Sequence, residues 1–143
     1  MAKVLAVCIS EKKGTQKKPV DSIKIRRDWG IEGDAHAGNW HRQISLLANE
    51  SVDKVRHILP DIQPGAFAEN ILTEGLILHT LPVGTRLKVG ETEIEVTQIG
   101  KECHQGCAIR RLTGDCVMPR EGIFCKVIVE GEIKPGDTIE VIE

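Results

Sequence analysis

Chemically reactive side chains are concentrated in a short stretch in the second half of the chain, where residues 100–107 read GKECHQGC. Within it, Cys103 lies between Lys101 and His104, at the start of a short helix expected over Cys103–Leu112. Neighbouring positive charges and a helix N-terminus both favour a thiolate over a thiol. The pattern therefore predicts a nucleophile or a soft-metal ligand at Cys103 rather than a buried apolar filler.

The other four cysteines leave alternatives open. Cys107 follows Cys103 by four residues, so a helix would place both thiols on one face, with Cys116 further along the chain. A zinc site is one alternative, but structural zinc sites usually contain paired Cys-x-x-Cys motifs, which this spacing lacks. Cys8 and Cys125 fall inside apolar runs, and we expect both in the core. An odd number of cysteines without an export signal favours free thiols or ligands over a disulfide framework.

A second candidate region is the glycine-rich stretch 30–43, GIEGDAHAGNWHRQ. Glycines let a backbone approach a ligand closely, and Asp34, His36 and Arg42 then supply hydrogen bonds to a polar ring or a phosphate. A glycine turn with solvated side chains is the alternative. Asp34 and His36 also suit a hard metal, but Glu32 is the only further carboxylate nearby.

Two further positions are candidates for ligand contact. Asn70 lies in the apolar run of residues 65–76, although asparagine is disfavoured in strands, so its amide either pairs with the backbone or recognises a ligand. Lys17 and Lys18 precede Pro19 in a lysine-rich loop, Glu11–Pro19, where they either neutralise a phosphate or are solvated.

The elements that must position these residues are mostly strands. Apolar runs or alternation between Gly and Pro turns predict strands at Lys3–Ile9, Val20–Arg27, Gln43–Leu47, Phe67–Leu72, Arg86–Val89, Thr92–Ile99, Ile123–Val129 and Thr138–Ile142. A two-residue hairpin at Gly90-Glu91 joins the fifth and sixth of these strands. One helix is expected from an N-cap at Asn49 or Ser51 to Pro60. Many short strands between turns predict a closed or nearly closed barrel, which removes exposed sheet edges.

Size and composition narrow the function. A chain of 143 residues predicts one domain, 1–143, with one core. The formal net charge of −2 and the absence of tyrosine argue against nucleic-acid binding. The composition also argues against a membrane span, and the N-terminus lacks the features of a secretory signal, so we expect a cytoplasmic protein.

Three separated segments resemble the MOSC family, named after the C-terminal domain of molybdenum cofactor sulfurases. The most distinctive strings are GDAHAG at residues 33–38 and ENILTEGL at residues 69–76, followed in the same order by 96–103 and 122–137. The resemblance to small stand-alone bacterial members covers nearly the whole chain. It implies a mostly β, MOSC-type barrel-like domain with a few short helices.

The resemblance also implies a function. Family members bind the molybdenum cofactor (molybdopterin) or carry sulfur toward it, through a cysteine that follows a strand, and Cys103 matches that position both as the reactive residue and as the molybdenum ligand. It also implies cofactor contacts at Asn70 and Ser51, and a basic loop at Lys18. The sequence includes neither a pyridoxal-dependent sulfurase domain nor a second barrel domain, so we expect a partner sulfur donor or molybdoenzyme.

Three readings follow. The first is a cofactor-binding or sulfur-carrier module, which delivers sulfur, as a persulfide, or cofactor to partner metalloenzymes. The alternative is an enzyme, a molybdenum-dependent reductase of N-hydroxylated compounds that needs a separate electron donor, because the sequence has no flavin, haem or iron–sulfur motif. The third is a barrel interaction domain whose cysteines only pack.

Overall fold

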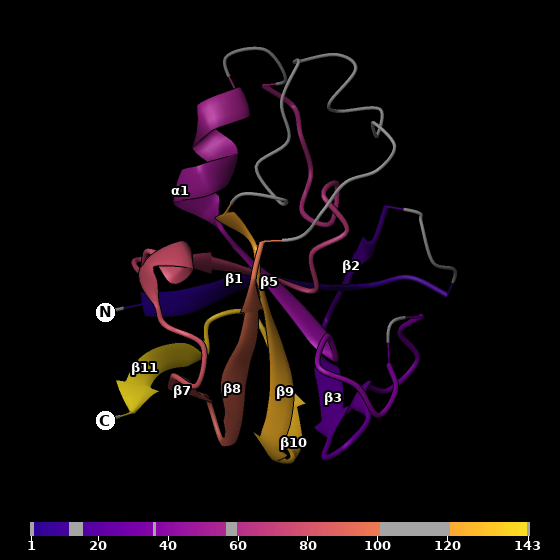
Figure 1. Ribbon diagram of the computed structural model, residues 1–143. Helices are drawn as coiled ribbons and strands as arrows, with labels where there is room; N and C mark the ends of the chain where they lie inside the picture. The colour runs from indigo at the N-terminus through magenta and orange to yellow at the C-terminus, as the bar shows by residue number, and fades with distance from the viewer. Residues whose placement is uncertain (1, 12–15, 36, 57–59, 101–120, 143) are drawn as a thin grey trace.

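The fold was described from a computed structural model that covers residues 2–11, 16–35, 37–56, 60–100 and 121–142. Its secondary structure is almost entirely β (Figure 1). The strands are β1 (Ala2–Ile9), β2 (Lys18–Val20), β3 (Ile23–Arg26), β4 (Gly30–Ile31), β5 (Ile44–Ala48), β6 (Ile71–Glu74), β7 (Arg86–Val89), β8 (Thr92–Ile99), β9 (Ile123–Val129), β10 (Gly131–Ile133) and β11 (Thr138–Ile142). Helix in the described ranges is limited to α1 (Asn49–Val52) and two 3₁₀ turns, η1 (Asp53–Val55) and η2 (Leu78–Thr80).

Seven strands form a closed barrel, as the turn-rich sequence predicts. The order is β11-β7-β8-β9-β5-β6-β1, and pairing between β1 and β11 closes the ring. β5 and β6 pair in parallel, while the other neighbours in the ring pair antiparallel. β2 adds to β1 outside the ring, and β10, β3 and β4 form a separate small sheet. Closure leaves the seven strands without the long open edge that would invite pairing with other chains.

Two apolar clusters lie on the two sides of the barrel wall. Alternate residues of the strands fill the interior, which holds Ala2, Val4, Val7, Ile23, Ile25, Ile31, Ile44, Leu46, Ala48, Ile71, Leu78, Leu87, Val89, Ile94, Val96, Ile123, Cys125, Val127, Ile133 and Ile139. The intervening residues of β1, β5, β6 and β9 form a second cluster on the outer face, with Ala6, Cys8, Leu47, Val52, Phe67, Leu72 and Phe124. α1 covers part of this outer cluster through Val52. We call the wall formed by β1, β6, β5 and β9 on this side the outer face.

Most predicted strands are confirmed, with small shifts at their ends. Arg86–Val89, Thr92–Ile99, Ile123–Val129 and Thr138–Ile142 occur with the expected bounds, and Gly90-Glu91 forms the expected hairpin turn. The single strand expected over Val20–Arg27 is instead two, β2 and β3, because Asp21 and Ser22 break the run. Lys18 therefore belongs to a strand and not to a loop.

Two predictions about local structure are wrong. The strand expected over Phe67–Leu72 begins at Ile71, because Gly65 and Ala68 adopt positive φ values of 89° and 62°, which a strand does not allow. The expected helix cap is also misplaced. β5 runs directly into α1 with Ala48 as N-cap in extended conformation, so neither Asn49 nor Ser51 caps it. The predicted end of this helix near Pro60 and the helix over Cys103–Leu112 fall outside the described residues or reach into that part.

No helix in the described ranges is long and apolar enough to cross a membrane.

Candidate functional site

The predicted reactive residue, Cys103, lies outside the described residues, as do His36, Cys107 and Cys116. The structure does describe both flanks of the stretch 101–120. The backbone N–H of Gly100, just after β8, donates to the carbonyl of Gly122, just before β9, over 2.6 Å. The stretch that contains Cys103 therefore leaves the barrel and returns to it at one point.

Arg42, a predicted ligand-binding residue, lies next to that point. Its guanidinium Nε donates to Oε1 of Gln98 over 3.2 Å, and Nε2 of Gln98 donates to the carbonyl of Gly100 over 2.7 Å. Nε2 of His41 lies 2.9 Å from the same Gln98 oxygen. The Gln98 side chain, which the sequence did not single out, thus links two basic residues to the start of the Cys103 stretch.

Aromatic rings hold the Arg42 side chain on the outer face. Its guanidinium carbon lies 5.3 Å from the ring centre of Phe124 and 5.8 Å from that of Trp40. A guanidinium at these distances is attracted to the negative face of an aromatic ring. Arg42 is only partly buried, so a positive charge remains available there in a defined orientation.

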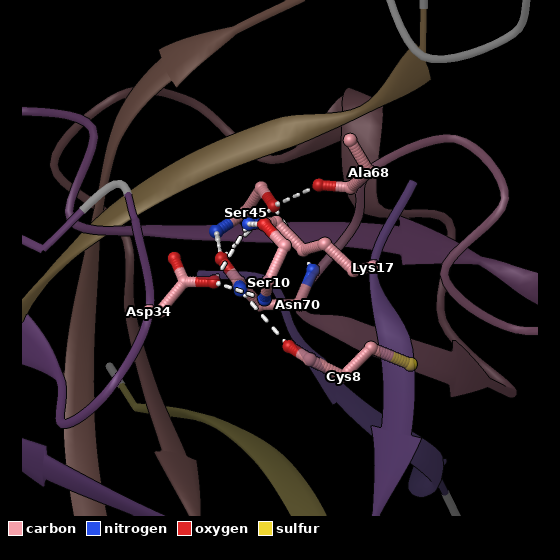
Figure 2. Close-up of polar contacts among 7 residues, drawn as sticks. All are labelled: Cys8, Ser10, Lys17, Asp34, Ser45, Ala68 and Asn70. Atoms are coloured by element: carbon pink, nitrogen blue, oxygen red, sulfur yellow. Dashed lines mark hydrogen bonds and ion pairs between the residues drawn. The ribbon is translucent and has the colours of Figure 1, made fainter. Parts of the chain in front are cut away.

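Asn70 pairs with the backbone, which is one of the two roles its sequence context allows. Its Oδ1 accepts bonds from the backbone N–H and the hydroxyl of Ser45, over 3.0 and 3.1 Å, and its Nδ2 donates to the carbonyl of Cys8 over 3.0 Å. Figure 2 shows this amide between β5 and β1. Asn70 is 1% exposed. Its amide satisfies buried polar groups at the point where the chain enters β6, and an unpaired buried amide would be costly.

A buried ion pair lies close to Asn70. The Lys17 ammonium donates to Oδ1 of Asp34 over 2.7 Å and to the Ser10 hydroxyl over 3.1 Å, and both charged side chains are fully buried. The backbone N–H of Ser10 also donates to Oδ1 of Asp34 (Figure 2). Asp34, predicted to contact a ligand, therefore binds Lys17. Of the two lysines before Pro19, Lys17 is buried, whereas Lys18 is exposed on β2.

Glu69 is a second buried carboxylate, which the sequence reasoning missed. Its two oxygens accept the backbone N–H groups of Gly65 and Phe67, over 2.9 and 3.1 Å. Burial raises the pKa of Glu69, although these backbone hydrogen bonds and the charge of Lys17 oppose that rise. Glu69 thus shapes the turn that leads into β6.

A third polar cluster lies at the return flank of the Cys103 stretch. Ser51, predicted to contact a cofactor, donates its hydroxyl to Oε1 of Glu121 over 2.7 Å. Lys54 donates to both oxygens of Glu121 over 2.8 and 2.7 Å, and Nδ1 of His79 lies 3.8 Å away. Between 67 and 70 residues separate Glu121 from Lys54 and Ser51, so no local pattern in the sequence could indicate this cluster.

The two described cysteines are core residues, as predicted. Cys8 and Cys125 are free thiols with 0% exposure. Burial raises the pKa of Cys8 to about 12 and raises that of Cys125 further, so neither forms a thiolate at neutral pH. Within the described ranges, no group of three or more His, Cys, Asp or Glu side chains is arranged to hold a metal ion.

Comparison with known proteins gives a consistent result. A sequence profile of the MOSC domain matches residues 33–140. The fold is similar to the crystal structure of YuaD from Bacillus subtilis, with a TM-score of 0.79, 22% identity, and coverage of 99% of this chain and 96% of that one. It is also similar to YiiM from Geobacillus stearothermophilus (TM-score 0.74, 19% identity, 100% and 76% coverage) and YiiM from Escherichia coli (0.66, 19%, 99% and 70%). No curated protein sequence gives a significant match.

Proposed function

This chain belongs to the MOSC domain family, which is associated with the molybdenum cofactor, and from that premise we propose a cytoplasmic module that delivers sulfur or cofactor to a partner metalloenzyme through Cys103. Of the readings open at the sequence level, carriage asks least of the described residues, because it needs one reactive thiol and a binding surface.

The observation that carries this proposal is the Gln98 bridge. Gln98 accepts from Arg42 and donates to Gly100, three residues before Cys103. Three peptide units span at most about 11 Å, so covalent geometry alone keeps the Cα of Cys103 within that distance of the Gly100 Cα. Residues 61 positions apart in the sequence are thereby drawn to one region of the barrel wall.

The donor set of this region fits one end of the cofactor. Arg42 is a partly buried guanidinium held by two aromatic rings, and such a group suits the terminal phosphate of a pterin. The buried thiols of Cys8 and Cys125 do not suit molybdenum, which leaves ligation to Cys103. When bound, the cofactor supplies a redox-active metal held by dithiolene sulfurs, so one protein thiolate suffices and no three-residue cluster is needed.

Sulfur carriage requires a simple exchange at Cys103. Its thiolate attacks the outer sulfur of a donor persulfide, the donor S–S bond breaks, and the donor leaves as a thiolate. Cys103 becomes a persulfide, and no external oxidant is consumed. Lys101 and His104, its neighbours in sequence, favour the attacking thiolate.

The experiment is to purify the protein from cells that synthesise the cofactor and to measure molybdenum, pterin and persulfide per chain. We expect Cys103→Ser to lose them, whereas Cys107→Ser and Cys116→Ser, made as matched thiol controls, retain them. Arg42→Gln should weaken retention of the pterin but leave persulfide formation at Cys103 intact, because the guanidinium contacts the phosphate and not the sulfur.

Equal loading of Cys103→Ser and the unmodified protein would refute the proposed function. Steady turnover of an N-hydroxylated substrate by loaded protein, with a supplied electron donor, would show an enzyme rather than a carrier and would also overturn it.

A further inference from the structure

The carboxylate of Glu121 has an unusually complete set of donors for a residue next to a loop. Its side chain is 9% exposed, and it accepts bonds from Ser51 in α1 and from Lys54 in η1, with His79 of η2 close by. One carboxylate thus joins the segment that leads into β9 to three separate elements packed at this end of the barrel. An exposed ion pair would be a weak connection, but one buried at the carboxylate and hydrogen-bonded by two donors is stronger.

The opposite flank of the stretch 101–120 is fixed as well. Gly100 donates to Gly122, and Gln98 donates to Gly100, so both flanks are tied to the wall and to each other. Gly100 has a φ of 69°, a left-handed conformation that turns the chain away from β8. The two ties differ in one respect. The Gly100 tie is between backbone groups, whereas the tie at Glu121 depends on side chains and can be removed by a single substitution.

We propose, on the basis of the function proposed above, that Glu121 is a positioning residue for Cys103: by binding Ser51 and Lys54 it fixes the return flank of the stretch and thereby the environment of the thiol. This assigns Ser51 a role different from the cofactor contact that the family resemblance implies. Its hydroxyl is committed to Glu121. It also gives Lys54, which the sequence did not single out, a structural function.

The test measures the reactivity of Cys103 directly, in a Cys107→Ser/Cys116→Ser background where Cys8 and Cys125 are buried. The rate of alkylation by iodoacetamide is followed against pH for the parent, Glu121→Gln and Glu121→Asp. Glu95→Gln is the matched control, because Glu95 also pairs with cations, Arg86 and Lys126, but on a different part of the wall. We expect Glu121→Gln to change the rate at neutral pH, or the midpoint of its profile, by at least about threefold, since small displacements of a reacting group have large effects on rate.

Glu121→Asp should restore part of the parent profile, and Glu95→Gln should match the parent. A Glu121→Gln profile identical to the parent, with only a lower melting temperature, would show a purely structural role and overturn the inference. This outcome is distinct from failure of the proposed function, since the parent would still load molybdenum or persulfide at Cys103. Loss of loading in the parent would instead refute the function and leave the alkylation result to stand by itself.

Discussion

Replacing Gly65 with alanine tests how closely the turn before β6 packs against the segment that supplies Lys17. Gly65 has a φ of 89°, and an added Cβ would overlap the Lys17 carbonyl oxygen and lie 2.7 Å from the carbonyl carbon. These are backbone atoms, so no side chain can rotate away. The Lys17 N–H also donates to the Gly65 carbonyl over 2.9 Å, which holds the two segments together.

The size of the effect follows from two separate terms. A left-handed conformation costs a non-glycine residue about 1–2 kcal/mol, and forcing a methyl group into a packed site costs about 1–3 kcal/mol. Gly65→Ala should therefore lower the free energy of unfolding by about 2–5 kcal/mol. Gly84 offers a matched control, because its φ is 97° but nothing lies within 4 Å of an added Cβ. Gly84→Ala should cost only the first term, about 1–2 kcal/mol.

Urea denaturation of both variants measures the difference. We expect the midpoint of Gly65→Ala to fall by about 1 M more than that of Gly84→Ala, with unchanged m values. Both substitutions stiffen the unfolded chain equally, so that contribution cancels in the comparison. Equal midpoints for the two variants would refute the claim that the turn and the Lys17 segment are in tight contact.

Two further substitutions test buried charge. Asp34→Asn leaves the Lys17 ammonium buried without its counter-ion, and we expect a loss of about 3–5 kcal/mol in urea denaturation, with a double Lys17→Met/Asp34→Leu variant more stable than Asp34→Asn; the reverse order would contradict the buried pair. At Glu121, burial alone would raise the pKa, but the hydrogen bonds from Lys54 and Ser51, with the charges of Lys54 and His79, outweigh it and hold the pKa below the ordinary value of 4.5. The stabilisation from this ionised group is complete above that value and is lost as the pH falls through the folded-state pKa. The difference in stability between the parent and Glu121→Gln should therefore shrink on acidification below about pH 4.5, and a difference that stays constant down to pH 3 would contradict it.

The family profile and the barrel agree with what the sequence predicts, but individual site residues divide into two kinds. Arg42 is in the predicted region because β5 places it there and the neighbouring rings hold it. Asp34 and Asn70, which the sequence also offered as ligand contacts, are buried and bound to Lys17 and to the backbone. Polar residue types in a glycine-rich or apolar context look the same in sequence whether a ligand or the protein itself satisfies them.

The sequence by itself determined the strands, most of their ends, the closed barrel and the core positions of Cys8 and Cys125, because alternation of apolar residues and turn chemistry are local properties. Only the tertiary structure decided that Lys17 rather than Lys18 is buried, that Ser51 binds Glu121, and that Gln98 connects Arg42 to Gly100. Each of these contacts joins residues that come together only when the barrel closes. Their energies depend on burial and distance in three dimensions, which no spacing along the chain encodes.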